Sequence, residues 1–298
     1  MQFILFVVLY PILWLISILP FRLLYLLSDF ICLIVYRVVR YRRNVVRNNL
    51  RLAFPNLSSV ERLKIERKFY SHMCDMFLEM IKTMTISDKE INKRFAYTNL
   101  DLYLELENRE KSIAVLCAHY ASYEWVISMN SHIRFEGFAI YKRIANPYFD
   151  KLVRDIRSRF KATLITTKET IPTIEKNQRE NRRGVYGFAG DQAPKASKIY
   201  HWGTFMGIES PIITGAEMLS KRFDMNVIFL KVKKVRRGYY VATFSNPIEN
   251  VRDYPDYAIS DAFMKCVEEQ IHEAPEFYLW THKRWKTTKP RPITKTTN

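Results

Sequence analysis

The stretch "SIAVLCAHYASYEW", Ser112 to Trp125, decides how the chain folds around its most reactive side chain. An apolar run from Ile113 to Ala118 leads directly into His119, and Glu124 follows five positions later. A short apolar run that ends at a polar residue is typical of a buried strand. The sequence therefore predicts an imidazole at the end of a buried strand, with a carboxylate just beyond it.

The turn after His119 determines where Glu124 lies. On one continuous helix, residues five apart point in directions that differ by about 140° and do not meet. A strand that ends at His119, followed by a helix that begins near Tyr123 with Ser122 as its N-cap, would bring Glu124 back beside the imidazole. A carboxylate there orients the ring and raises its basicity. We therefore predict a general-base pair, His119 and Glu124, that removes a proton from a substrate hydroxyl; a purely structural histidine is the alternative.

Strand-length apolar runs continue along the chain, with helical segments between several of them. The predicted strands are Ile113–Ala118, Phe138–Tyr141, Thr163–Thr166, Val185–Ala189, Val227–Val232 and Tyr239–Phe244. Before them, Ser58 and Glu61 have the spacing of a capping box that begins a helix. This order predicts an α/β domain with a mixed β-sheet flanked by helices. The expected regions are a membrane anchor over 1–40, a helical region over 41–100, the α/β core over 101–285 and a basic tail over 286–298.

The N-terminal segment is apolar enough to suggest a membrane anchor. Phe3 to Phe21 is a run of 19 residues without a charge, about the length that spans a bilayer as a helix. The next run, Leu23–Tyr36, is interrupted only by Asp29. We expect either one span or two helices that dip into one leaflet, because Pro11 and Pro20 can bend the first run. A buried helical hairpin of a soluble protein is the alternative.

A basic cluster follows the anchor and fits this orientation. Its members are Arg37, Arg40, Arg42, Arg43, Arg47 and Arg51. Basic flanks stay on the cytoplasmic side of a membrane, next to anionic headgroups. A secretory signal peptide is disfavoured, because no basic segment precedes the apolar run and no small-residue cleavage motif follows it.

Composition limits the partners. The chain has 298 residues, and 48% of them are hydrophobic, which excludes a disordered protein. Its net charge of +17 implies partners with negative charge. A membrane-tethered nucleic-acid-binding protein would explain the charge but neither the His–Glu pair nor the anchor, so no nucleic acid is expected. Four cysteines lie far apart without a CxxC pair, so we expect free thiols, no metal site and no cofactor.

Several further blocks carry a resemblance to one family. They are "YRRNVVRNNLRLAFPNLS" (Tyr41–Ser58), "YKRIANP" (Tyr141–Pro147), "GDQ" (Gly190–Gln192), "FMGIESPIITG" (Phe205–Gly215) and "EFYLWTHKRWK" (Glu276–Lys286). His119 and Glu124 match the signature His-x4-Asp/Glu of the same family. With these blocks and this pair, the chain resembles the late acyltransferases of lipid A biosynthesis, within the lysophospholipid acyltransferase superfamily. The blocks follow the family's order over nearly the whole chain.

The resemblance implies a glycerolipid acyltransferase-like fold and an O-acyl transfer. The donor would be an acyl thioester, on acyl carrier protein or as acyl-CoA, and the acceptor a hydroxyl of a lipid A precursor. The protein would lie at the bacterial inner membrane with its catalytic domain on the cytoplasmic face. The candidate substrate-binding residues are Lys142, Arg143, Asn146, Arg154, Arg159 and Asp191.

Two departures leave the acceptor open. Lys142 stands where the family usually has arginine, and lysine does not form the two-pronged contact that arginine makes with phosphate. The loop after Asp191 also differs from the family's usual form. Another lipid acceptor, such as a lysophospholipid, an amino-acid lipid or a glycolipid, is therefore the main alternative. A non-catalytic scaffold on the same fold is a weaker one, because the His–Glu pair is intact.

Overall fold

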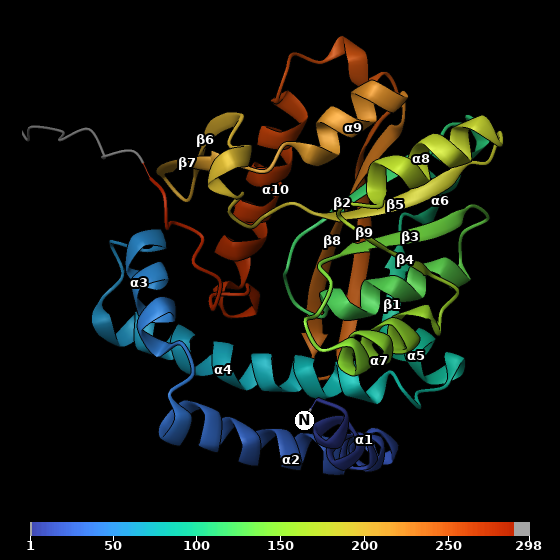
Figure 1. Ribbon diagram of the computed structural model, residues 1–298. Helices are drawn as coiled ribbons and strands as arrows, with labels where there is room; N and C mark the ends of the chain where they lie inside the picture. Colours follow the sequence, from blue (N-terminus) through green and yellow to red (C-terminus); the bar gives the residue numbers. More distant parts are fainter. Residues whose placement is uncertain (1, 289–298) are drawn as a thin grey trace, which may run out of the picture.

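Seven strands form one mixed sheet in the computed structural model, which describes residues 2–288 (Figure 1). In order across the sheet they are β1 (Phe95–Thr98), β9 (Tyr239–Ile248), β8 (Asn226–Arg236), β2 (Ile113–Cys117), β5 (Gly184–Ala189), β3 (Glu136–Tyr141) and β4 (Thr163–Thr166). Neighbouring strands are parallel except for the antiparallel pair β8 and β9. The predicted mixed sheet flanked by helices is confirmed.

The six predicted strands are all present, and the structure adds three. The edge strand β1 lies in the segment that the sequence assigned to helices, and it has four residues with one buried side chain, Phe95. The hairpin of β6 (His201–Phe205) and β7 (Ile208–Ile212) forms a separate two-stranded sheet. These strands are short and only partly apolar, so hydrophobic periodicity does not mark them.

Helices cover the sheet and its ends (Figure 1). The α-helices are α1 (Gln2–Ile18), α2 (Phe21–Leu33), α3 (Arg43–Ala53), α4 (Ser59–Lys82), α5 (Asp88–Arg94), α6 (Leu100–Asn108), α7 (Pro147–Ser158), α8 (Thr170–Arg179), α9 (Gly215–Phe223) and α10 (Ala258–Glu273). A π-helical turn, η1 (Ile34–Val39), follows α2. Short 3-10 helices are η2 (Tyr123–Ser131), η3 (Ala196–Lys198), η4 (Val251–Asp253) and η5 (Pro275–Phe277).

The long helix α4 separates the N-terminal helices from the sheet (Figure 1). It begins with the predicted capping box, which is confirmed. The Glu61 N–H donates to the Ser58 hydroxyl at 3.2 Å, and the Ser58 N–H donates to the Glu61 carboxylate at 2.7 Å. Both α1 and α2 pack against α4. Helix α2 also contacts the turn between β8 and β9 directly, where Arg237 donates to the Asp29 carboxylate and to the Tyr25 carbonyl.

The N-terminal apolar run is divided between two helices. The first ends at Ile18, because Pro20 has no N–H to donate and disfavours helical geometry at Leu19. Pro11 lies inside α1 without ending it. Within residues 2–288, no helix is both long enough and apolar enough to cross a membrane. The single continuous span expected over Phe3–Phe21 is therefore not supported.

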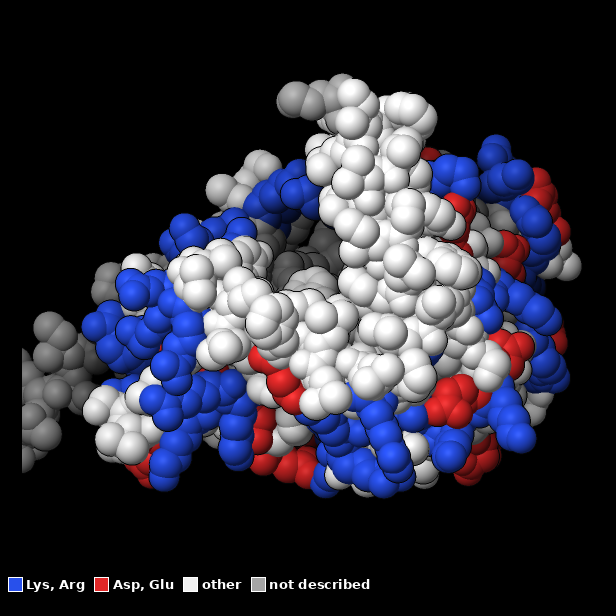
Figure 2. All heavy atoms as spheres, turned by 90° about the horizontal axis from the view of Figure 1, so that it is seen from below, with Lys and Arg blue, Asp and Glu red and all other residues white. Residues whose placement is uncertain are grey.

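These helices nevertheless present a broad apolar face. Its exposed side chains, called the apolar band here, are Phe3, Ile4, Leu5, Val7, Val8, Tyr10, Ile12, Trp14, Leu15, Ile18, Leu23, Leu26, Phe30, Leu33, Ile34, Val38 and Val39. Figure 2 shows an uncharged surface on this side of the molecule, bordered by Lys and Arg. An exposed apolar surface of this extent marks an interaction site with a membrane or another protein.

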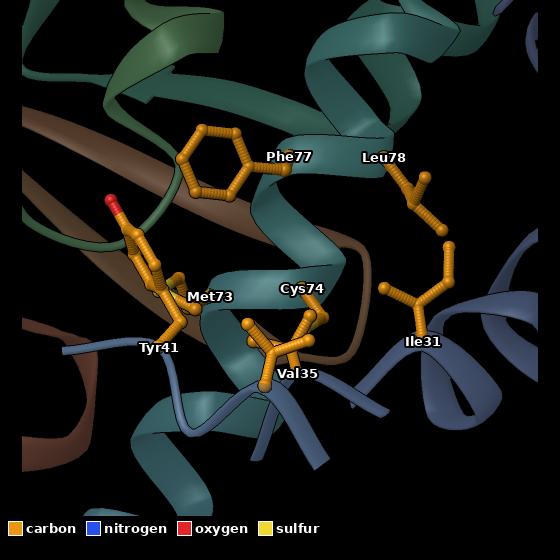
Figure 3. A pocket seen from close by; sticks show the side chains of 8 residues that line it. Ile31, Val35, Tyr41, Met73, Cys74, Phe77 and Leu78 are labelled. Carbon is orange, nitrogen blue, oxygen red and sulfur yellow. The ribbon is translucent and has the colours of Figure 1, made fainter. Parts of the chain in front are cut away.

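An apolar cavity of about 250 Å³ lies between the α2–η1 segment and α4 (Figure 3). Its lining residues are Ile31, Val35, Val39, Tyr41, Met73, Cys74, Phe77 and Leu78. On α4, helical geometry places Met73 and Phe77 on the face opposite Asp75 and Glu79. The residues that line this cavity include none from the loops after β2 and β5 that carry His119 and Asp191.

Candidate functional site

Two loops at the same edge of the sheet bring His119 and Asp191 together. Strands β2 and β5 are parallel neighbours, with Cys117 opposite Ala189. Two residues beyond this pair, the segment after β2 reaches His119 and the segment after β5 reaches Asp191. The His119 Nδ1 lies 2.8 Å from the Asp191 Oδ1, and the His119 backbone N–H donates to the same oxygen at 3.1 Å. The sheet register thus assembles a histidine–carboxylate pair.

Burial and charge set the protonation of this pair. The Asp191 side chain is 1% exposed and that of His119 is 21% exposed. Burial opposes ionisation of Asp191, but the His119 charge and the two hydrogen bonds outweigh it and lower its pKa. Burial likewise acts to lower the pKa of His119, but Asp191 and then Glu124 outweigh it, so this pKa is raised. A neutral His119 donating Nδ1–H to Asp191 leaves Nε2 free to accept a proton.

Glu124 lies in the same site but has a different partner. Its carboxylate accepts hydrogen bonds from Arg157 on α7, from Nη2 at 2.7 Å and from Nε at 3.0 Å. The fork of a guanidinium matches a carboxylate in this way. The expected direct contact between His119 and Glu124 is therefore not confirmed, because Asp191 holds the imidazole nitrogen. Glu124 remains close enough for its charge to raise the pKa of His119.

The local turn also differs from the expected one. Ala121 adopts a left-handed conformation with φ of 50°, and the segment after it is a 3-10 helix. Ser122 precedes this helix but makes no side-chain cap; its hydroxyl donates to the buried Glu79 carboxylate at 3.5 Å. The predicted Ser122 cap is wrong: its hydroxyl oxygen accepts no N–H of the helix and instead points its O–H at a carboxylate from α4.

The C-terminal segment closes the site from the other side. The Leu279 N–H donates to the His119 carbonyl at 3.1 Å, and the Tyr278 hydroxyl donates to the Asp191 carbonyl at 3.4 Å. His282 accepts from the Ala193 N–H at 3.2 Å. Burial lowers the pKa of His282 to about 4, so it stays neutral and able to accept. Residues distant in sequence thus hold both loops of the pair.

The predicted substrate-binding cations divide into free and committed groups. Lys142 and Arg143 are exposed in the loop after β3, with Arg143 Nε 4.0 Å from an Asp150 oxygen. Arg154 is exposed on α7. Arg159 instead donates to two backbone carbonyls between α4 and α5, of Met84 at 2.6 Å and of Ile86 at 2.5 Å.

Asn146 and Asp191 have local partners as well. Asn146 is the N-cap of α7, and its side-chain oxygen accepts from the N–H groups of Tyr148 at 3.0 Å and Phe149 at 3.4 Å. Asp191 lies against His119 rather than among the exposed cations. Sequence reasoning missed Arg157, because nothing in the helix distinguishes it from Arg154 and Arg159. Across residues 2–288, no three His, Cys, Asp or Glu side chains gather as a metal ion requires.

The chain is similar to known proteins along most of its length. The family model described as bacterial lipid A biosynthesis acyltransferase matches residues 2–287. The lipid A biosynthesis lauroyltransferase of Escherichia coli (strain K12) is 24% identical over 277 residues, which cover 93% of this chain and 89% of the relative. The palmitoleoyltransferase of the same organism is 26% identical over 296 residues, covering 95% and 90%. Its myristoyltransferase is 21% identical over 245 residues, covering 82% and 75%.

Proposed function

The chain belongs to the bacterial lipid A biosynthesis acyltransferases, and on that premise we propose that it moves a fatty acyl chain from a thioester to a hydroxyl of a lipid A precursor. It is an acyltransferase. The observation that carries the proposed chemistry is the hydrogen bond between His119 Nδ1 and the buried Asp191 carboxylate. That bond leaves His119 Nε2, on a partly exposed ring, as a base for a hydroxyl proton.

The proposed reaction is a direct transfer. His119 Nε2 takes the proton of the acceptor hydroxyl as its oxygen attacks the thioester carbonyl carbon. The new C–O bond forms, the tetrahedral intermediate collapses, the C–S bond breaks, and the proton passes from His119 to the departing sulfur. Asp191 holds the ring and stabilises the imidazolium, and Glu124 adds a second negative charge nearby. Arg157 keeps the Glu124 carboxylate in place.

The surface charge supports an anionic donor and acceptor. Acyl carrier protein is acidic, so it is the expected carrier, with acyl-CoA as the alternative; either would be attracted by a chain of net charge +17. The exposed Lys142, Arg143 and Arg154 are the candidates for phosphate groups of the acceptor. Asn146 and Arg159 are weaker candidates, because their side chains already bind the backbone.

Membrane association is part of the proposal. The apolar band would insert into one leaflet at the cytoplasmic face of the bacterial inner membrane. The lysines and arginines that border it would meet anionic headgroups (Figure 2). A lipid acceptor would then reach the site without leaving the membrane surface.

Lipid mass spectrometry after deletion and complementation tests the function. The deletion strain should accumulate lipid A that lacks one acyl chain, and the intact gene should restore that chain. A His119→Ala copy, present at the same protein level, should not restore it. Unchanged lipid A together with an altered phospholipid or amino-acid lipid would contradict the proposed acceptor and identify the altered lipid as the acceptor instead.

A further inference from the structure

Arg284 is a buried cation without a hydrogen-bond partner among the described residues. It is 1% exposed, and its Nε, Nη1 and Nη2 atoms all lack an acceptor there. Burying an unpaired charge costs several kcal/mol in general, and a methionine would fill the same space without that cost. Such a residue requires a reason beyond packing.

The surroundings of Arg284 contain a single carboxylate of interest. Its guanidinium carbon lies 5.0 Å from the centre of the Phe205 ring, and Tyr278 is close on the same segment. Asp191 is near enough for its negative charge to act on the guanidinium. The Asp191 Oδ2 atom is also buried without a hydrogen-bond partner among the described residues, while its Oδ1 serves His119. Arg284 and Asp191 are therefore two buried, oppositely charged groups with unpaired polar atoms, and the charge of one acts on the other.

This position does not suit a substrate phosphate. A phosphate is large and strongly hydrated, and a side chain that is 1% exposed cannot meet it without opening the fold. The exposed Lys142, Arg143 and Arg154 are accessible to such a group. The cation of Arg284 therefore acts on buried groups of the protein rather than on a substrate phosphate.

We propose that Arg284 is a positioning residue for His119, which acts through the Asp191 carboxylate. Its cation offsets the cost of keeping Asp191 ionised in a buried place, so the carboxylate stays available to the Nδ1–H of His119. The role in turnover rests on the proposed function, but the effect on the imidazole does not. Other charged or titratable groups around His119 are Tyr123, Glu124, Arg157, Tyr278 and His282.

The titration of His119 tests the proposal in the purified full-length protein. Histidine labelled with ¹⁵N would be followed by NMR in the wild type and in Arg284→Met, which keeps the length and removes the charge. Spectra of His119→Gln would assign the signal. We expect the apparent pKa of the His119–Asp191 pair to rise by roughly half a unit to one unit, because a neighbouring cation no longer opposes protonation. Arg284→Lys keeps a cation and should leave the pKa near the wild-type value.

Stability and kinetics give independent readouts. Thermal unfolding checks that Arg284→Met is folded, because the change removes an unpaired buried cation but also leaves the buried Asp191 carboxylate without that neighbouring charge. The acid side of its kcat/KM profile should shift to higher pH with the NMR titration. Arg182→Met is the matched control, because Arg182 is half exposed and pairs with Glu180 at the surface.

Three results would overturn the proposal. The His119 titration could stay unchanged in folded Arg284→Met, or it could shift as much in Arg284→Lys, which retains the charge. A lower rate of acyl transfer with an unchanged His119 titration would mean that Arg284 acts on the substrate instead of on His119. A wild-type protein that transfers no acyl chain would count against the proposed function only, because the NMR titration needs no substrate.

Discussion

His119 and Asp191 occupy equivalent positions on two adjacent parallel strands, each two residues beyond the paired Cys117 and Ala189. Their side chains meet at 2.8 Å although 72 residues separate them in the chain. In parallel strands the carboxyl ends lie at the same edge of the sheet, so the register brings the two loops together. The position of the base and of its carboxylate therefore depends on strand pairing rather than on a local motif.

Asp191→Asn should slow acyl transfer by about 10²- to 10⁴-fold, because the amide neither fixes the Nδ1–H tautomer nor stabilises the imidazolium. The pKa of His119 should fall, since the charge of Asp191 is what chiefly raises it against burial. The acid side of the kcat/KM profile should then move to lower pH. Initial rates of folded, purified protein from pH 5 to 9 give both quantities. Asp256→Asn, which removes the charge from an exposed ion pair, is the control and should leave the rate unchanged. A wild-type rate in Asp191→Asn would mean that Asp191 has only a structural role.

Glu124 and Arg157 should act as one unit. Glu124→Gln and Arg157→Gln should each lower kcat by roughly 10- to 100-fold, the equivalent of a charge-assisted hydrogen bond. The double variant should be no slower than the slower single variant, since either change breaks the same pair. A double-mutant cycle of kcat measures this.

Glu180 and Arg182 supply the matched control for that cycle. They form an ion pair of the same type at the surface, where such pairs contribute little. Glutamine at either position should leave kcat unchanged. Independent, multiplying losses at Glu124 and Arg157 would mean that each has a separate role.

Glu79 should make stability depend on pH. It is fully buried and accepts hydrogen bonds from Tyr25, Tyr240 and Ser122. Burial raises its pKa from 4.5 to about 7, so the folded state holds a proton that the unfolded chain releases. Its contribution is present below pH 4.5 and is lost as the pH rises through about 7. The loss is on the order of 3 kcal/mol for this shift.

Glu79→Gln imitates the protonated carboxyl and should remove this dependence. Relative to the wild type, the variant should gain melting temperature at pH 8 and gain little at pH 4. Thermal unfolding at the two pH values measures the difference. An equal loss at both values would show that the fold needs the carboxylate itself rather than its proton.

The apolar band should drive binding to lipid. Val8 and Leu26 are 58% and 65% exposed on α1 and α2. Changing both to Asp should weaken binding to vesicles of phosphatidylethanolamine and phosphatidylglycerol by at least roughly tenfold, because each apolar side chain contributes about 1.5–3 kcal/mol when buried. Flotation of the vesicles measures the bound fraction. Ile171→Asp on α8, far from the band in Figure 1, is the control and should bind vesicles as the wild type does. Equal binding by all variants would mean that the band contacts a protein partner rather than lipid.

Local patterns in the sequence determined much of the fold. The apolar run Ile113–Ala118 predicted a buried strand with His119 at its end, and the spacing of Ser58 and Glu61 predicted a capping box. Both features depend on residues that are neighbours along the chain, so their physics is visible in the sequence. The proposed basic tail, by contrast, lies outside the described residues from position 289 onward.

Only the tertiary structure decided which charges meet. The sequence placed Glu124 beside His119 through a strand end, a turn and a new helix. The β2–β5 register placed Asp191 there instead, and α7 supplied Arg157 to Glu124. Likewise nothing in the C-terminal block marks Arg284 as buried and within reach of the Asp191 charge. Contacts between distant segments follow from strand order and helix packing, which involve the whole chain at once, so no short stretch of sequence contains them.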